Sequence, residues 1–316
     1  MQTCEVHNLT GLFFYMDISA YTGELAALAT AVFWTITAMA FEVASKNIGS
    51  LAVNMIRLVL AFIFLSIFNI VARGLILPVD ASTHAWVWLS ISGLVGFVFG
   101  DYFLFKSFAM ISARVSMLVM TLVPPITALI GWILLGEVMN TLELTGMFLT
   151  VSGIAMAIFS RGEKGGKRKL KLSYPLRGIL FALGGTVGQA VGLVLSKYGM
   201  GDYNAFAATQ IRIIAGMIGF AIIIVILGKG GLIRKAFKSR PGMIGTGIGS
   251  VFGPFLGVSF SLLAVKYAAT GVASTLMAIV PILIIPPSVI FFKQKLSWLE
   301  VAGAIISVGG VTLFFI

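Results

Sequence analysis

The sequence predicts an all-α polytopic membrane protein with ten transmembrane helices, built from two five-helix inverted repeats. Three observations predict this fold: an apolar composition with few charges, ten apolar runs of membrane-spanning length, and two halves that align with each other. Of the 316 residues, 59% are hydrophobic and 10% are charged, and the mean hydropathy is +1.06. Soluble domains contain about 45–50% apolar residues and a larger polar surface, so these values exclude a soluble protein.

The apolar runs are each close to the roughly 20 residues that a helix needs to cross the hydrocarbon core. The predicted spans are Glu24–Ser45, Ser50–Ala72, Ala85–Ser107, Ala113–Leu135, Leu142–Ser160, Gly178–Tyr198, Ala205–Leu227, Met243–Val265, Val272–Phe292 and Trp298–Ile316. Strands of an outer-membrane barrel would instead give alternating segments of about 10 residues.

A strongly basic segment, residues 161–177, is the only break between spans with substantial polar content, and it divides the chain into two sets of five spans. The predicted organisation is therefore an N-terminal tail at 1–22, a first repeat at 23–160, a basic linker at 161–177 and a second repeat at 178–316. The tail contains no Lys or Arg, so it lacks the basic region of a secretory signal.

The two repeats align at nearly constant offsets. The aligned segments are, at an offset of 155, Gly23–Leu28 with Gly178–Leu183 and Arg57 with Arg212, and at an offset of 157, Thr121–Pro124 with Ala278–Pro281. An odd number of spans in each unit places the second copy upside down in the bilayer. Such inverted repeats hold a substrate site near the midplane, at the interface between the repeats.

Several motifs follow one another in a fixed order. The first half contains Phe99-Gly-Asp-Tyr-Phe-Leu-Phe-Lys-Ser-Phe-Ala-Met-Ile-Ser-Ala113, Leu122-Val-Pro-Pro125 and Leu134-Leu-Gly-Glu137, and the second half repeats the order more weakly, with Val280-Pro281, Leu299-Glu300 and Gln294 in place of the acidic residue. Over about residues 23–316 this order resembles the EamA domain of the drug/metabolite transporter superfamily. The resemblance implies a ten-helix secondary transporter, commonly an exporter of amino acids or other small metabolites.

The positive charges are unevenly distributed between the two faces of the membrane. Sorting the 22 Lys and Arg residues by the predicted loops and nearest span ends places 18 on one face and only Arg73, Lys197, Arg212 and Lys266 on the other. The positive-inside rule then predicts both termini outside and the 161–177 linker in the cytoplasm of a cell (inner or plasma) membrane. The family resemblance implies the reverse, with cytoplasmic termini. We follow the charge bias, because it acts on the insertion of this chain.

Ionisable groups inside a span cost about 2.5–3.5 kcal/mol on insertion scales, so each is a functional candidate. Glu42, Arg57, Asp101 and Lys106 lie toward one face of the membrane. They form either a gate or coupling site, in which a carboxylate exchanges a proton or changes partner between the two cations, or a static charge network that closes one end of the bundle. Arg212, the counterpart of Arg57, either attracts carboxylates from the opposite side or ties its span to a carbonyl end.

An amphipathic pocket is expected near the midplane, where Trp34 and Gln189 align at the offset of 155. The candidate substrate-binding residues are Trp34, Thr37, Phe99, Tyr102, Phe105, Gln189 and Ser259. Each of the aromatic residues is equally compatible with a position in the core or against lipid.

Glycines and prolines predict how the spans pack. Glycines at four-residue spacing should allow close helix approach, at Gly184, Gly188 and Gly192 in the sixth span and at Gly245, Gly249, Gly253 and Gly257 in the eighth. Pro124, Pro125 and Pro281 should kink the fourth and ninth spans, because proline lacks the backbone N–H of the helix.

Other function classes are less compatible with the sequence. Cys4, His7 and His84 are the only cysteine and histidines, which excludes thiolate or histidine-rich metal cages, and no cofactor is expected. An enzyme is not expected, because no span contains His. The alternative is a channel-like facilitator or a membrane scaffold without coupled transport. Expected partners are a small-molecule substrate and membrane lipid, with no nucleic acid, for a monomer or homodimer.

Overall fold

The computed structural model describes residues 21–159, 175–287 and 298–315, and all regular structure within these ranges is helical. Most of the predicted tail at 1–22, most of the linker at 161–177 and Gln294 lie outside the described residues.

The first half contains α1 (Thr22–Ile48), α2 (Ser50–Arg73), α3 (Thr83–Gly93), the π-helical segment η2 (Leu94–Asp101), α4 (Tyr102–Met120), α5 (Val123–Leu135) and α6 (Thr141–Phe159). The second half contains α7 (Leu176–Met200), α8 (Ala205–Ile226), α9 (Gly231–Ala236), α10 (Arg240–Ser250), the π-helical segment η4 (Val251–Gly257), α11 (Val258–Tyr267), α12 (Thr270–Met277), α13 (Val280–Leu283), α15 (Trp298–Thr312) and a final 3-10 turn, Leu313–Phe315.

Seven helical stretches among the described residues are long and apolar enough to cross a membrane. They are Thr22–Ile48, Ser50–Arg73, Thr83–Ile111, Leu176–Met200, Ala205–Ile226, Arg240–Tyr267 and Thr270–Pro287. Three shorter apolar helices, Val123–Leu135, Thr141–Met156 and Val301–Thr312, overlap the fourth, fifth and tenth predicted spans. The chain is therefore a polytopic α-helical membrane protein. The predicted boundary between the third and fourth spans is wrong, because α4 continues from Tyr102 to Met120 and the break falls just before the prolines that start α5.

Local chemistry accounts for where several helices begin and end. The side chains of Ser82, Asn204 and Ser239 accept hydrogen bonds from backbone N–H groups in the first turns of α3, α8 and α10. Gly74 and Gly136 adopt left-handed conformations directly after α2 and α5, which other residues adopt at a cost. These five helices thus start or stop on a residue suited to the terminal backbone groups of the helix.

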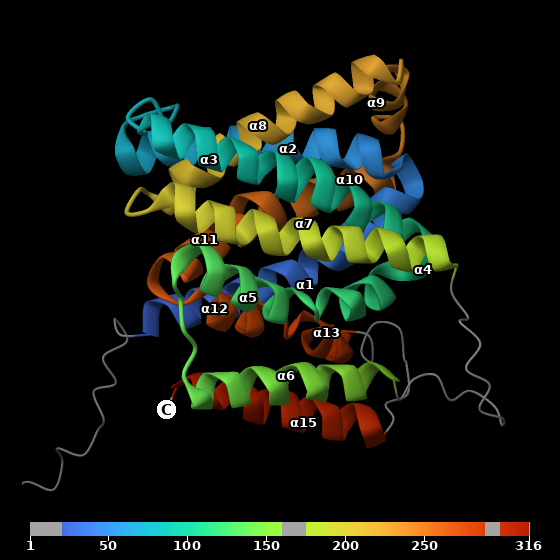
Figure 1. The fold of residues 1–316 in the computed structure, drawn as a ribbon. Coiled ribbons are helices and arrows are strands. Elements are labelled where there is room, and N and C mark those ends of the chain that lie inside the picture. The colour runs from blue at the N-terminus through green and yellow to red at the C-terminus, as the bar shows by residue number, and fades with distance from the viewer. Residues whose placement is uncertain (1–20, 160–174, 288–297, 316) are drawn as a thin grey trace, which may run out of the picture.

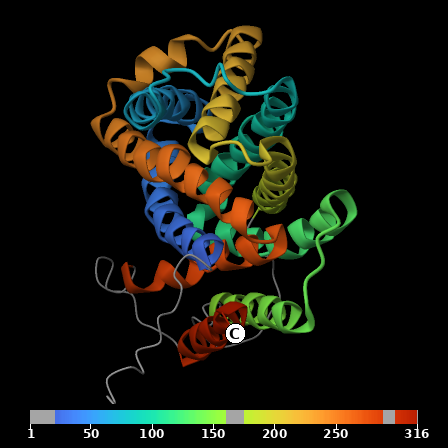
Figure 2. The same cartoon turned by 90° about the vertical axis from the view of Figure 1, so that its left-hand side faces the viewer.

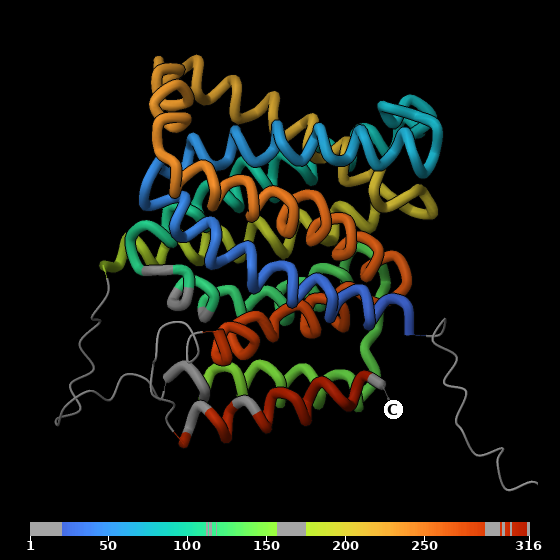
Figure 3. The backbone as a smooth tube through the Cα atoms, turned by 180° about the vertical axis from the view of Figure 1, so that it is seen from behind, coloured from blue at the N-terminus to red at the C-terminus, as the bar shows by residue number. Residues whose placement is uncertain are grey.

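The helices stack with their long axes roughly parallel, and helices of one half pack on helices of the other (Figure 1). Helix α2 packs on α8, α5 packs on α12, and α1 runs beside α10 and α11 (Figure 3). In the same way α7 packs on α3, η2 and α4. Helices α6 and α15 pair with each other in an outer layer (Figure 2).

The largest hydrophobic cluster joins the two halves through α2, α3 and α8. Leu58 and Leu65 on α2, Leu89 on α3, and Ile211 and Phe220 on α8 are fully buried in it. Burial of a large apolar side chain away from water contributes about 1.5–3 kcal/mol, and inside a bilayer close packing supplies the corresponding contacts. The interface between the halves is therefore part of the buried core.

Both predicted glycine rows lie where helices approach each other closely. A Cβ atom at Gly188 would lie 2.5 Å from the Cα atom of Gly100, and one at Gly192 would lie 2.9 Å from the Cα atom of Gly96. In the other row, a Cβ atom at Gly245 would lie 2.7 Å from the carbonyl oxygen of Ala40 in α1. The absence of side chains at these positions lets α7 pack on η2, and α10 pack on α1.

We expect Gly188→Ala to destabilise the fold by about 1–3 kcal/mol, because its methyl group meets the backbone of η2, which cannot move aside as a side chain could. The matched control is Gly247→Ala in α10, where no atom lies within 4 Å of an added Cβ. Thermal unfolding of the purified chain should show a lower Tm for Gly188→Ala only. Equal effects of the two substitutions would contradict the packing described.

Candidate functional site

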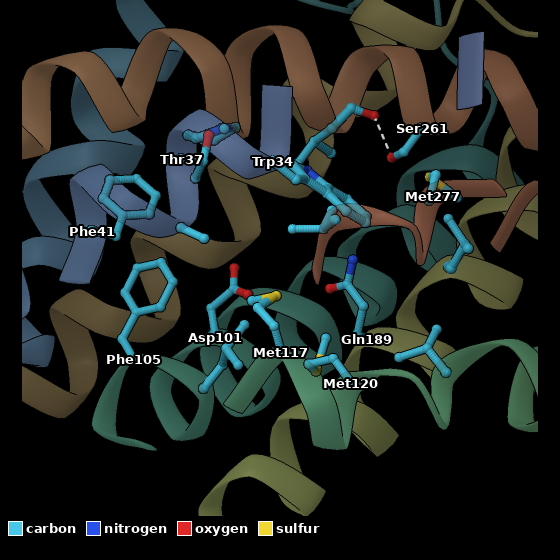
Figure 4. Close-up of a pocket in the computed structure, with 18 of the residues that line it drawn as sticks. Trp34, Thr37, Phe41, Asp101, Phe105, Met117, Met120, Gln189, Ser261 and Met277 are labelled. Atoms are coloured by element: carbon cyan, nitrogen blue, oxygen red, sulfur yellow. Dashed lines mark hydrogen bonds between the residues drawn. The ribbon is translucent and has the colours of Figure 1, made fainter. Parts of the chain in front are cut away.

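A cavity of about 100 Å³ lies between the two halves (Figure 4). It is lined by α1, α2, η2 and α4 from the first half, by α7, α8, η4, α11 and α12 from the second, and by residues at the starts of α5 and α13. Figure 4 shows Trp34 and Thr37 on one side of the space and Asp101, Met117 and Gln189 on the other. Most of the wall is aromatic, methionine or aliphatic. Its polar side chains are those of Thr37, Arg57, Asp101, Gln189, Arg212, Ser261 and Ser274.

An ion pair between Arg57 and Asp101 forms one wall of the cavity. Arg57 Nη2 lies 2.5 Å from Asp101 Oδ2, and Arg57 Nε donates to Asn54 Oδ1 at 3.0 Å. The guanidinium carbon is 4.8 Å from the ring centre of Phe105 and 5.4 Å from that of Phe97. Because Arg57 is only 3% exposed, the pair is held away from solvent, where neutralisation by a partner is strongly favoured.

Arg212 brings a second guanidinium to the cavity, from α8. It is 4% exposed, and its carbon lies 4.8 Å from the ring centre of Phe97. Among the described residues its Nε has no hydrogen-bond partner, and no carboxylate lies within ion-pair distance. A Cβ atom at Gly96 would lie 3.0 Å from Arg212 Nη2, so the glycine leaves room for this cation.

Uncharged polar groups complete the lining. Gln189 extends from α7 toward Trp34 (Figure 4), and the buried hydroxyl of Thr37 has no hydrogen-bond partner within the described part of the chain. By contrast, Ser261 Oγ donates to the carbonyl of Val258 at 2.8 Å, and Ser274 Oγ donates to that of Gly271 at 3.0 Å. Gln189 and Thr37 can therefore donate to or accept from a solute, while the two serine hydroxyls have already used their protons and can only accept.

The structure brings together seven of the predicted site residues. Those that line the cavity are Trp34, Thr37, Phe105 and Gln189 from the predicted pocket, and Arg57, Asp101 and Arg212 from the predicted charged cluster. Phe99, Tyr102 and Ser259 do not line it: Phe99 is 47% exposed, and the buried hydroxyl of Ser259 has no hydrogen-bond partner among the residues that the structure describes.

Glu42 and Lys106 also lie away from the cavity, each with its own contacts. Glu42 pairs with Lys46 one turn later at 2.6 Å, and accepts a bond from the backbone N–H of Ala113 at 3.4 Å. The ammonium of Lys106 lies 4.7 Å from the ring centre of Phe181 and 3.5 Å from the hydroxyl of Tyr102. Within the described ranges, neither Glu42 nor Lys106 forms an ion pair or hydrogen bond with Arg57 or Asp101.

The prolines mark interruptions at equivalent places in the two halves. Pro124 and Pro125 stand in the first turn of α5, after a turn that separates it from α4, and Pro281 stands in the first turn of α13, after a turn that separates it from α12. Pro281 lines the cavity. Pro254, within the π-helical segment η4, lines it as well and removes one backbone N–H from the helix.

The cavity also contains residues that the sequence reasoning missed. These are mainly Phe41, Phe97, Phe108, Met117, Met120, Met277 and Ser274. Helical spacing could have found two of them, because Phe41 is four residues from Thr37 and Phe97 is four residues from Asp101, on the same helix faces. The methionines carry no such signal in an apolar sequence.

Polar contacts tie the two halves together at the end of the bundle away from α9. Asp80 accepts from Tyr203 Oη at 2.8 Å and pairs with Arg73. The hydrogen bond from Tyr203, helped by Arg73, lowers the pKa of the Asp80 carboxyl. Burial, followed by the bond to Asp80, raises the pKa of the Tyr203 hydroxyl. At neutral pH the Asp80 carboxyl is thus ionised and the Tyr203 hydroxyl protonated, the two states in which this hydrogen bond forms.

A second contact at this end joins α5, α7 and α12. Glu137 Oε1 lies 2.5 Å from Lys197 Nζ, and Glu137 Oε2 accepts from the backbone N–H and the hydroxyl of Thr270 at 2.7 and 2.6 Å. Lys197 also donates to the carbonyl of Ala268 at 2.7 Å. Glu137 belongs to the first half and its partners to the second, so this contact too closes the end of the bundle.

No group of three or more His, Cys, Asp or Glu side chains in the described ranges could hold a metal ion. What the cavity offers is a buried place for a small solute, with aromatic and methionine walls, one neutralised ion pair and one unpaired cation.

Comparison with known proteins agrees with a transporter. The model of the EamA-like transporter family matches residues 21–159 and again 176–316. An uncharacterized transporter of Archaeoglobus fulgidus is 32% identical over 117 residues, which are 37% of this chain and 40% of that relative's length. A solved structure described only as the crystal structure of a protein shares the fold, with a TM-score of 0.67 and 18% identity over 92% of this chain and 96% of that chain.

The family match covers both halves and most of the chain, and it confirms the resemblance that the motif order indicates. It points to transport rather than catalysis. The chain belongs to the EamA-like transporter family.

Proposed function

We propose that this transporter is a secondary transporter that moves small metabolites by alternating access, and that it exports amino acids or related organic solutes. The observation that carries the proposal is the buried cavity with three charged side chains between the two halves. Charges at such depth are costly to keep, and in membrane proteins they mark solute pathways. The driving force would be a gradient of the solute or of a coupled ion.

The proposed architecture is ten spans in two inverted repeats, residues 23–160 and 178–316. The π-helical segments η2 and η4 begin 157 residues apart, as do α5 and α13. Contacts between the halves are reciprocal as well, because α1 packs on α10 and α11 while α7, at the start of the second half, packs on α3 and α4. This reciprocity supports a pseudo-twofold relation with a solute site at its axis.

The end contacts around Asp80 and Glu137 support a conformation closed at that end. Each joins the first half to the second, so opening the cavity there requires both to break. In this proposal the cavity residues Arg57, Asp101 and Arg212 bind or gate the solute, and the contacts at the end hold one of the alternating states.

We propose a cell-membrane location with both termini outside and the 161–177 linker in the cytoplasm. The N-terminal end of α1 and the C-terminal end of α15 lie at one end of the bundle (Figure 1). The basic helix α9 lies at the other end, as do the C-terminal end of α6 and the N-terminal end of α7, which flank the linker. Separation of basic and less basic ends supports the charge bias of the sequence.

The transport proposal predicts counterflow. In proteoliposomes, uptake of a labelled solute from a panel of amino acids, organic acids and amines should accelerate when the same unlabelled solute is inside, because a carrier returns faster when loaded. The alternative, a channel-like facilitator, predicts flux without acceleration. A scaffold predicts no flux above empty liposomes, and either result would contradict the proposal.

The ion-pair prediction separates a gating role from a structural one. Asp101→Leu should cost about 3–5 kcal/mol of stability, because it leaves Arg57 buried without its carboxylate. The double variant Arg57→Leu/Asp101→Leu removes both charges and should recover most of the Tm. We expect this stable double variant to lose counterflow. Wild-type transport by the double variant would show that the pair only supports the fold.

The orientation prediction uses single cysteines in a Cys4→Ser background. A cysteine at Gly165, in the linker, should resist an impermeant thiol reagent in intact cells and react after permeabilisation. The matched control is Val79→Cys in the loop between α2 and α3, where the side chain is 71% exposed and should react in intact cells. The reverse labelling pattern would place the termini in the cytoplasm.

A further inference from the structure

We infer that the cavity selects a net-anionic organic solute with an apolar body, and that Arg212 binds its carboxylate. This inference rests on the proposed transport function and names the substrate class of the same site. Its basis is the charge arrangement of the cavity, taken together with the hydrogen-bond state of its polar side chains.

The charges that line the cavity do not balance. Asp101 pairs with Arg57 at 2.5 Å, which leaves the guanidinium of Arg212 as the uncompensated charge. Arg212 is 4% exposed, its Nε has no partner among the described residues, and its nearest aromatic contact is Phe97. Asp101 also attracts Arg212 at longer range, but one carboxylate cannot neutralise two buried guanidinium groups, so an anionic solute supplies the negative charge that the cavity lacks.

The geometry of the cation suits a carboxylate. A guanidinium presents its N–H donors in a planar fork, which can bind both oxygens of one carboxylate. Gly96 contributes by leaving space beside Nη2, where any larger residue would press on the guanidinium. Gln189 and Thr37 add uncharged polar groups to the same cavity.

A primary amine finds no comparable partner. An ammonium gains most from a carboxylate, but Asp101, the carboxylate among the described lining residues, already has Arg57 as its charge partner. The hydroxyl oxygens of Ser261, Ser274 and Thr37 can accept from an ammonium, but they carry no charge to compensate it. The face of Trp34 could attract a cation, yet two guanidinium groups line the same space and repel it. The cavity therefore favours an anion over a zwitterion, and a zwitterion over an amine.

The apolar residues of the lining determine the size and shape of the apolar group that a solute can carry. Trp34, Phe108, Met117, Met120 and Met277 surround the space with rings and flexible thioethers, which adapt to differently shaped apolar groups. The cavity volume is about 100 Å³. An apolar protein cavity of about 150 Å³ is known to hold benzene, so this smaller cavity suits a short branched chain as it stands, and admits a single ring when its flexible methionine side chains move aside.

The test uses four probes with the same ring and different charge: phenylacetate, phenylalanine, phenylacetamide and phenethylamine. Competition against radiolabelled phenylacetate on the purified full-length chain measures affinity without requiring translocation. We expect phenylacetate to bind at least about tenfold more tightly than the amide or the amine, with phenylalanine between them. Arg212→Gln should weaken phenylacetate binding at least about tenfold, and Arg212→Lys should weaken it less. The matched control, Arg234→Gln on exposed α9, removes the same charge and should bind as wild type.

The wild-type series keeps the inference testable even if Arg212→Gln fails to fold. Equal affinity for the amide and the anion, tighter binding of the amine, or no saturable phenylacetate binding would overturn it. Unchanged binding by folded Arg212→Gln would overturn it as well. Failure of the transport proposal looks different: charge-selective binding that depends on Arg212 would persist, but no probe would show flux or counterflow in proteoliposomes.

Discussion

The pairing of Arg57 with Asp101 inside the bundle is the interaction on which the rest of the site depends. It joins α2 to the π-helical segment η2, and the surrounding rings of Phe97 and Phe105 keep water from it. In a medium of low polarity each charge is costly without its partner, so the pair favours one register of the two helices. The pair also engages Asp101, the carboxylate among the described cavity residues. The cavity therefore keeps an excess positive charge, at Arg212. The ion pair in the first half thus determines that Arg212, in the second half, is the cation available to a solute.

Close packing makes this arrangement possible. The glycine rows on α7 and on α10 and η4 bring backbones together on both sides of the cavity, and Gly96 on η2 leaves the volume that the Arg212 guanidinium occupies. Contacts between the halves dominate the interior, while the polar contacts of Asp80 and Glu137 sit at one end. A bundle built in this way can hold a buried cavity and still change which end is closed, because the polar end contacts are local and separable from the apolar interface.

Much of this could be predicted from the sequence, and the failures share a physical cause. Span positions, the glycine approaches and the family follow from apolar length, four-residue spacing and motif order. The members of the charged cluster were harder to predict, because the position of a residue within a span does not show which face of the helix it occupies. Lys106 is five residues from Asp101 and therefore lies on a different helix face, where it meets Phe181 instead. Phe99 and Tyr102, two residues before and one residue after Asp101, are likewise turned away from the cavity.

The central claim is that Arg212 makes a solute-accessible cavity net positive. Reaction rates at a single cysteine test it most directly, with Met117→Cys in a Cys4→Ser background placing the thiol on the cavity wall beside Asp101 (Figure 4). Anionic and cationic methanethiosulfonates of similar size should then react at different rates. The account predicts that the anionic reagent reacts faster and that Arg212→Gln abolishes its advantage. Faster reaction of the cationic reagent, or equal rates with Arg212 present, would contradict it.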